Sequence, residues 1–143
     1  MVVALQVYIT NITKRYSSLP VIAVGVLLYA VSMFMISLST GFWGFWISMV
    51  VLTFGELTLV PTANAYTAKR APAHMRGRYM SIFGLTWGMS HGVGALLGGL
   101  LNDTLGPIFI WIGAGIIALA GFAFLLYLIR VERREAQTAA PLT

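Results

Sequence analysis

The sequence predicts an all-α membrane protein with four transmembrane helices, and three observations support this fold class. Hydrophobic residues make up 59% of the 143 residues and charged residues only 9%, which leaves too little polar surface to cover a water-soluble globule. Four apolar runs are long enough to cross a bilayer. The nine Lys and Arg residues lie only in alternate gaps between long apolar runs.

The distribution of basic residues predicts the orientation of the chain. They gather at residues 14–15, 69–78 and 130–134, whereas the intervening gaps, residues 39–41 and 102–106, contain no Lys or Arg. Basic loops of multi-span proteins stay on the cytoplasmic side. We therefore expect a multi-pass protein of the cell inner (plasma) membrane. Its cytoplasmic segments would be loops 11–18 and 67–78 and the C-terminus.

The expected spans follow from length and from the backbone's need for hydrogen bonds. A hydrocarbon core of roughly 30 Å requires about 20 helical residues at about 1.5 Å each. Helices satisfy all backbone groups in lipid, and no run alternates with the period of a barrel strand. The expected spans are residues 20–39, 42–66, 79–101 and 107–129.

The two ends of the chain differ from these spans. Residues 1–10 are apolar, but ten helical residues cover only about 15 Å. We interpret them as the end of a truncated transmembrane helix, so that the chain is a fragment or a truncated gene product with its partner helices upstream. Residues 11–131 would form the four-helix transmembrane part, and residues 132–143 a cytoplasmic tail that frays into disorder.

Several function classes have no visible apparatus in this sequence. There is no cysteine, which excludes a disulfide framework and a thiolate metal site. There is also no Walker A, HExxH or GxSxG sequence, so we expect no enzyme activity, no cofactor and no metal. The net charge of +5 lies at membrane boundaries without an aromatic-basic recognition motif. This favours the lipid bilayer over nucleic acid as a partner.

Glu56 is the most informative side chain, because it is the only acidic residue within an apolar run. An intramembrane carboxyl is a functional-site candidate by default. Desolvation favours its neutral form, so such a group can take up and release a proton as its exposure to water changes. Thr53 and Asn64 lie within about 80° of Glu56 around the helix, which predicts one polar stripe. The alternative is a neutral Glu56 hydrogen-bonded to a neighbouring helix.

Gly55 and Pro61 predict a kink in the same span. Proline removes a backbone donor, and glycine loosens the helix around it. The freed carbonyl needs water or a neighbour in a membrane, so a kink beside a buried acid favours a polar cavity.

The third span is rich in small residues, which predicts close packing against another helix and possible sliding between helices. The residues concerned are Gly84, Gly88, Gly92, Gly98 and Gly99. His91 in this span has two interpretations, either a titrating partner of Glu56 or a hydrogen bond across a tight contact. Trp87 is large enough to line a substrate cavity, and ordinary interhelical packing is its alternative role.

The second basic segment holds Arg76, Gly77 and Arg78 after a Pro turn. Topology alone explains these charges. The sharper hypothesis is that Arg76 and Arg78 bind helix C-terminal carbonyls or acidic groups when the cytoplasmic side closes.

These residues together resemble the C-terminal part of the major facilitator superfamily, in particular its drug-efflux-like branch. The resemblance rests on Gly-Glu-Leu-Thr-Leu-Val-Pro at 55–61, Ala71-Pro72, Arg-Gly-Arg-Tyr-Met at 76–80, Gly-Ala-Leu-Leu-Gly-Gly at 94–99 and the turn at 102–106. It implies that the four spans are helices nine to twelve of that family's bundle and that residues 1–10 end helix eight.

The resemblance also implies a function. Two bundles of such a transporter rock about a cavity at mid-membrane and expose it alternately to each side. We expect secondary active transport, with proton-coupled export of small molecules or drugs and with Glu56 responding to protons or contacting substrate. Its partners would be a small-molecule substrate, protons and the missing N-terminal helices. A nutrient or solute symporter and a stand-alone four-span assembly or regulatory protein remain alternatives.

Overall fold

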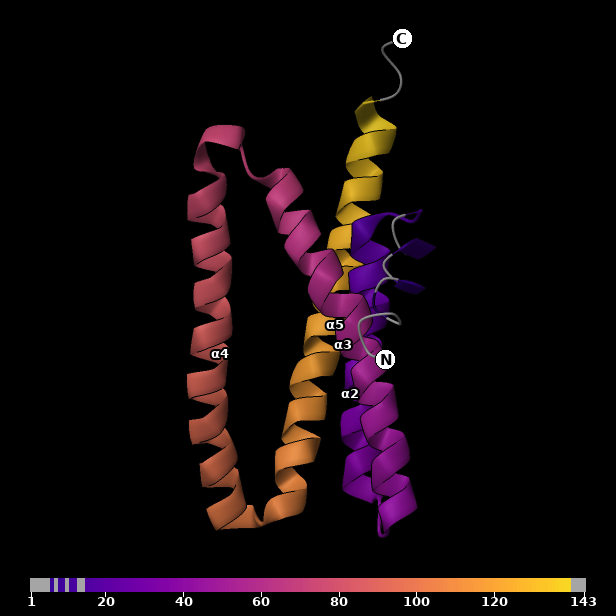
Figure 1. Ribbon diagram of the computed structural model, residues 1–143, viewed down its shortest axis with the longest axis vertical. Coiled ribbons are helices and arrows are strands. Elements are labelled where there is room, and N and C mark those ends of the chain that lie inside the picture. The colour runs from indigo at the N-terminus through magenta and orange to yellow at the C-terminus, as the bar shows by residue number, and fades with distance from the viewer. Residues whose placement is uncertain (1–5, 7, 10, 13–14, 140–143) are drawn as a thin grey trace.

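The computed structural model describes residues 6, 8, 9, 11, 12 and 15–139, with side chains as far as Arg134 (Figure 1). The elements in chain order are α2 (Ser18–Leu38), α3 (Phe42–Arg70), the short 3-10 helix η1 (Ala73–Met75), α4 (Arg76–Leu105) and α5 (Pro107–Ala139). No strand occurs among these described residues. The predicted all-α fold is confirmed. The interpretation of residues 1–10 falls mostly outside the described part of the chain.

Three of the long helices satisfy both requirements of a membrane span. They are Ser18–Leu38, Phe42–Arg70 and Pro107–Arg134, each long and apolar enough to cross a bilayer. Helix α4, the third predicted span, has 30 residues and therefore sufficient length. Its glycines and polar side chains lower its hydropathy, and it is not among the three.

Proline and glycine set the helix boundaries, as their backbone chemistry requires. Pro107 occupies the first position of α5, where its missing N–H would have no partner in any case. Gly106 ends α4 with φ 104°, a conformation that other residues rarely adopt, and its amide donates to the Leu101 and Asn102 carbonyls. Only this one residue separates α4 from α5.

The C-terminal segment departs from the expectation of a frayed tail. Helix α5 continues through Ala139, ten residues beyond the expected end of the last span. Residues 132–139 are rich in Glu, Arg, Ala and Gln, which are strong helix formers. Helix propensity explains the extension, because these residues favour helix without needing an apolar environment.

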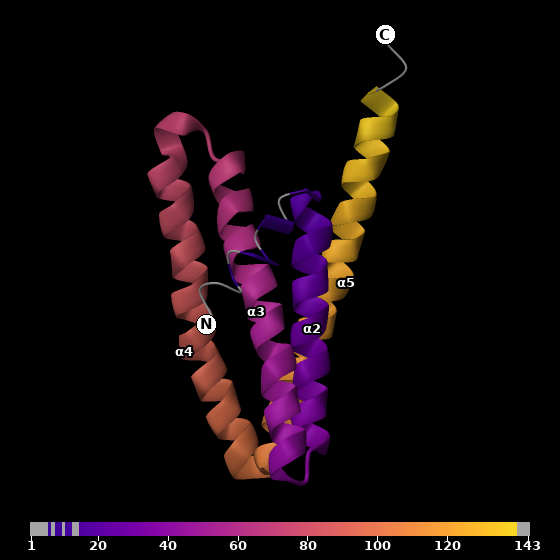
Figure 2. The same cartoon turned by 45° about the vertical axis from the view of Figure 1, so that its right-hand side comes forward.

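The helices run in alternating directions, so the basic segments gather at one end of the bundle (Figures 1 and 2). We call this the basic end. It comprises the start of α2, the end of α3, the start of α4 and the end of α5. The turns at residues 39–41 and 106 lie at the opposite end. The charge pattern of the sequence thus corresponds to a real separation in space.

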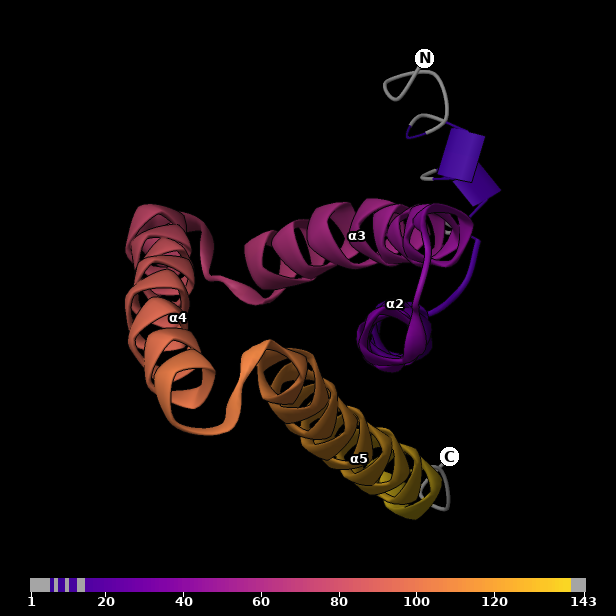
Figure 3. The ribbon, with the colours of Figure 1, turned by 90° about the horizontal axis from the view of Figure 1, so that it is seen from below.

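Helix α2 is the centre of packing, and it lies between α3 and α5 (Figure 3). It provides most of the buried apolar side chains of the described residues: Leu19, Val21, Ile22, Ala23, Ala30 and Ile36. The α2–α3 crossing is close because both helices present glycine there. A Cβ built on Gly25 would lie 2.9 Å from Leu59 Cβ, and one on Gly55 would lie 3.2 Å from the Gly25 carbonyl oxygen. Small residues allow such backbone approach in membranes.

Helices α3 and α4 open away from this centre. The first half of α3 runs beside α2, whereas its second half diverges from α2 and leans toward α4 (Figures 1 and 3). Helix α4 contacts its neighbours sparingly, and it has no buried residue within the described chain. The result is a packed group of α2, α3 and α5 with α4 standing to one side.

Buried serine hydroxyls within the spans are satisfied by their own helices. Ser32 and Ser48 are fully buried, and they donate to the Tyr29 carbonyl at 2.7 Å and the Gly44 carbonyl at 2.8 Å. Such local bonding is the expected solution where no water reaches the chain. The exposed apolar side chains of these helices suit contact with acyl chains.

Candidate functional site

Glu56 lies on α3 next to the crossing with α2, and its partner is Tyr29. The Tyr29 hydroxyl donates a hydrogen bond of 2.8 Å to Glu56 Oε1. The close approach of Gly25 and Gly55 brings the two backbones near enough for this contact. The bond joins the two helices at mid-span, and it agrees with the interpretation in which Glu56 bonds to a neighbouring helix. Sequence reasoning did not single out Tyr29.

Tyr29 also lines a cavity between helices, whereas Glu56 is exposed and is not among the residues that line it. A cavity of about 650 Å³ lies among α2, α4 and α5, and its wall includes Tyr29, Met33, Met89, Ser90 and Val93. Most of this lining is apolar. The residue that bonds Glu56 is therefore part of the wall of a space between helices.

The predicted polar stripe of α3 divides into two parts in the structure. Thr53 is exposed, and its hydroxyl donates to the Met49 carbonyl at 2.9 Å. The Asn64 amide donates to the Val60 carbonyl at 3.0 Å. Asn64 also lines a separate cavity of about 410 Å³ between α3 and α4. Only Asn64 of the predicted stripe thus lines this α3–α4 cavity.

Trp87 and Gly84 of α4 line the same α3–α4 cavity as Asn64. The structure therefore brings together three predicted residues from two helices. His91 is exposed, and its ring lies 6.3 Å from the Trp87 ring, centroid to centroid. Among the described residues, no hydrogen bond or ion pair joins His91 to Glu56. A pairing of these two side chains stays a prediction.

Gly55 and Pro61 have different positions than one shared kink would require. Gly55 is buried at the contact with α2, so its role in the structure is close packing. Pro61 lies within α3, and the second half of this helix leans away from α2 toward α4 (Figure 1). The missing N–H of proline weakens the helix at that point.

Arg76, Gly77 and Arg78 open α4 at the basic end. Both arginines are exposed, and neither has an ion pair within the described part of the chain. Gly77 and Arg78 line a cavity of about 1040 Å³ between the end of α3 and the start of α4. The hypothesis that they bind acids or carbonyls in another conformation stays a prediction.

The glycines of α4 face open space within the described residues. A Cβ on Gly84, Gly88, Gly92 or Gly99 would meet nothing within 4 Å, and one on Gly98 would make ordinary contact with Ile110 Cγ2 at 3.9 Å. Their packing role stays a prediction. Sequence reasoning missed the glycines with close contacts, among them Gly25 and Gly115, because spacing along one helix does not reveal where another helix crosses it.

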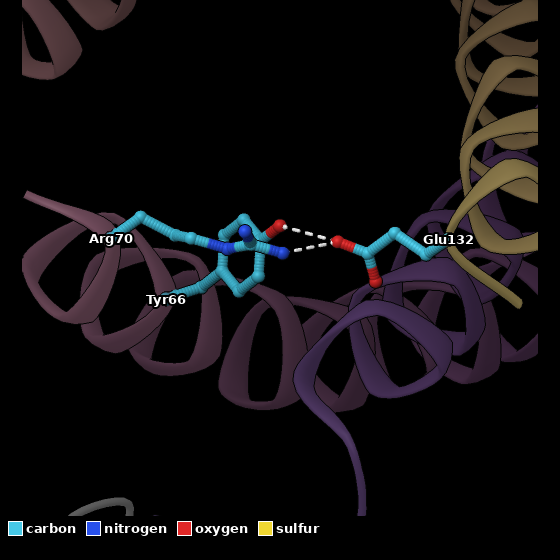
Figure 4. Close-up of polar contacts among 3 residues, drawn as sticks. All are labelled: Tyr66, Arg70 and Glu132. Atoms are coloured by element: carbon cyan, nitrogen blue, oxygen red, sulfur yellow. Dashed lines mark hydrogen bonds and ion pairs between the residues drawn. The ribbon is translucent and has the colours of Figure 1, made fainter. Parts of the chain in front are cut away.

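A polar cluster at the basic end was also missed. Tyr66 and Arg70 of α3 both contact Glu132 of α5, 62 residues or more along the chain (Figure 4). No local sequence signal links such distant residues. Separately, no group of three or more His, Asp or Glu side chains in the described residues is arranged to hold a metal ion.

Comparison with known proteins identifies the family. The model of the Major Facilitator Superfamily matches residues 1–143, the whole chain. The chain belongs to this superfamily. Membership places it among transporters rather than enzymes, and its helices form part of a bundle of that superfamily.

Relatives within the superfamily are similar over most of this chain. The multidrug resistance protein MdtH of Photorhabdus laumondii is 30% identical over 82% of the chain and 29% of its own length. The Na(+), Li(+), K(+)/H(+) antiporter of Planococcus maritimus is 30% identical over 87% of the chain and 28% of its own length. The multidrug efflux pump SdrM of Staphylococcus aureus is 33% identical over 62% of the chain and 20% of its own length.

The matched region covers less than a third of each of these three relatives. No solved structure matches the chain significantly.

Proposed function

We propose that this chain is part of a secondary active transporter that exports small molecules in exchange for protons. Family membership and the printed names of the relatives, two of which describe multidrug resistance or efflux, support export. The observation that carries proton coupling is the hydrogen bond from Tyr29 to Glu56 in the middle of two spans. Helices outside this chain would complete the substrate cavity.

The chemistry of this pair suggests how a proton is exchanged for cargo. While Glu56 is ionised, its carboxylate accepts the Tyr29 hydroxyl in a charge-assisted bond. Binding of H⁺ to Glu56 neutralises the acceptor and weakens that bond. The Tyr29 hydroxyl is then free to donate to a molecule bound in the cavity that Tyr29 lines. Release of the proton reverses these steps, so proton and cargo compete for one hydroxyl.

The orientation proposed for the membrane follows from the charge pattern. The basic end carries Arg15, Lys69 and Arg70 together with the arginines of α4 and α5. Positive loops remain in the cytoplasm. We place this end on the cytoplasmic face of the inner membrane, which makes both basic loops and the end of α5 cytoplasmic.

The decisive experiment is Glu56→Gln in the full-length transporter reconstituted into vesicles. Glutamine keeps the shape and still accepts the Tyr29 hydrogen bond, but it does not titrate. In the unaltered protein, an imposed pH gradient should accelerate efflux of a lipophilic fluorescent dye. In Glu56→Gln this acceleration should be at least ten-fold smaller, while insertion and folding are retained. Asp103→Asn, an exposed carboxyl in the last turn of α4, is the matched control and should leave the acceleration unchanged.

Two results would contradict the proposal. Flux in the unaltered protein that ignores the pH gradient excludes proton coupling altogether. Full coupling in Glu56→Gln assigns Glu56 to helix packing instead.

Exchange of monovalent cations for protons is the second candidate. It is favoured by the similarity to the protein named as a Na(+), Li(+), K(+)/H(+) antiporter. Vesicles loaded with a pH-sensitive dye separate the two functions. A change of internal pH on addition of NaCl or KCl, without any organic substrate, supports cation exchange. Export of the lipophilic dye, with no change of internal pH on addition of these salts, supports drug export.

A further inference from the structure

Three side chains form a compact network at the basic end, across two helices. The Arg70 guanidinium lies over the Tyr66 ring, 5.4 Å from its centroid, one helical turn away on α3. Arg70 Nη2 donates to Glu132 Oε1 of α5, and the Tyr66 hydroxyl donates to the same oxygen at 3.3 Å (Figure 4). We call Tyr66, Arg70 and Glu132 the α3–α5 tie.

The tie joins two helices that otherwise meet through a third. Helices α3 and α5 each pack extensively on α2, and extensive contact between α3 and α5 themselves is absent from the described part of the chain. A cavity of about 360 Å³ at this end is lined by residues 17–20 of the α2 segment, by Tyr66 and by Ile129, Glu132 and Arg133. The tie therefore closes a triangle of three helix ends around that cavity.

The chemistry of the tie exceeds that of a simple surface pair. Arg70 and Glu132 side chains are 62% and 43% exposed, and an isolated ion pair at that exposure contributes little. Here one carboxylate oxygen receives two donors, and the cation also lies over the ring of the second donor. Each member thus restricts the geometry of the others, as in other charge-assisted networks.

Helix α4 has no comparable attachment. Within the described residues, its contacts with α3 and α5 are sparse, and no ion pair involves Arg76 or Arg78. Its hydroxyls bond only to their own helix, as Ser81 to Gly77 and Ser90 to Thr86 show. Movement of α4 therefore breaks no side-chain hydrogen bond between helices in this part of the protein.

We propose that the α3–α5 tie makes α2, α3 and α5 move as one body, and that α4 is the helix that changes position during the transport cycle. This inference rests on the proposed transport function only in requiring a conformational cycle. It assigns a mechanical division within the four-helix part, and it does not depend on Glu56, on protons or on the identity of the cargo.

Distance measurements between spin labels test this division in the full-length transporter in lipid nanodiscs. The 143 residues contain no cysteine, so label sites introduced here displace no native thiol. One labelled pair, Ala65→Cys with Arg130→Cys, reports on α3 against α5. A second pair, Ser81→Cys with Arg130→Cys, reports on α4 against α5. All three positions are exposed.

The expected result is a narrow distance distribution for the α3–α5 pair and one at least two-fold wider for the α4–α5 pair. Arg70→Gln and Glu132→Gln should each widen the α3–α5 distribution at least two-fold. The double variant Arg70→Glu with Glu132→Arg restores the opposite charges, so its α3–α5 distance distribution should be nearly as narrow as that of the unaltered protein. Lys69→Gln, which removes the adjacent exposed cation outside the tie, should have no effect.

Three outcomes would overturn the proposal. The first is an α3–α5 distance distribution as wide as that of the α4–α5 pair. The second is an α3–α5 distribution that neither Arg70→Gln nor Glu132→Gln widens. The third is a widening by Lys69→Gln as large as that by Arg70→Gln. Because the readout is helix position, its failure is distinguishable from failure of the proton-coupling proposal, which is read from flux.

Discussion

At the scale of single residues, Glu56 is hydrogen-bonded by a neighbour that the sequence did not indicate. The apolar run around Glu56 was enough to mark it as unusual, because a carboxyl in lipid needs a reason. Its partner Tyr29 lies 27 residues away on α2, and the contact depends on the glycine crossing that brings the helices together. The carboxyl was therefore predictable, whereas the donor that holds it was not.

Tyr29→Phe tests this pair by removing one hydroxyl. Glu56 then loses its donor from α2. A bond to a charged group contributes about 1.5–3 kcal/mol, so the midpoint of the pH profile of transport should move by about one to two pH units. Vesicle flux measured across a pH series gives this midpoint. An unchanged midpoint would show that the bond does not affect the pH response of transport.

At the scale of helices, composition and turn chemistry predicted the elements well. The four long helices, the proline start of α5 and the short glycine turn before it follow from backbone rules that act locally. The departures arose where side chains act across space. Helix α5 is longer than expected, and Asn64 and Trp87 line one cavity because the second half of α3 leans toward α4.

Gly25→Ala tests the crossing on which that geometry depends. The added Cβ would lie 2.9 Å from Leu59 Cβ and 3.0 Å from the Leu59 backbone nitrogen, and neither atom is the free end of a flexible side chain. Overpacking of this kind typically costs about 1–3 kcal/mol. In a titration with denaturing detergent, the midpoint of unfolding should shift to a lower detergent concentration.

The matched control is Gly41→Ala, in the turn before α3. Its φ of −151° suits any residue, and an added Cβ would meet nothing within 4 Å. The midpoint of unfolding of Gly41→Ala should lie at the same detergent concentration as that of the wild type. Equal stability of both variants would mean that the α2–α3 crossing tolerates separation, contrary to the packing described above.

At the scale of the whole molecule, the chain represents less than a third of its transporter relatives. Helix α4 has no buried residue in the described part of the chain, although its sequence predicts close packing of its glycines. The family and the all-α fold were readable from the sequence. The substrate was not, because selectivity resides in side chains that converge from many helices.

Gly88→Leu tests whether helices outside this chain pack on the glycine face of α4. Nothing within the described residues lies within 4 Å of a Cβ at this position. If other helices of the full-length transporter dock there, the large side chain should destabilise it by about 1–3 kcal/mol. The detergent titration that measures Gly25→Ala measures this as well. A stability equal to wild type would show that the face is turned to lipid.

The one-residue turn between α4 and α5 also determines how far the distant end of α4 moves when the helix tilts. Gly106 has the backbone freedom of a pivot, and α4 extends from it for 30 residues, or about 45 Å. A tilt of roughly 5° about that pivot would displace the far end of such a lever by roughly 4 Å. That sweep is comparable to the width of a small organic molecule, and it would occur beside Arg78, where α3 and α4 border the largest cavity described above.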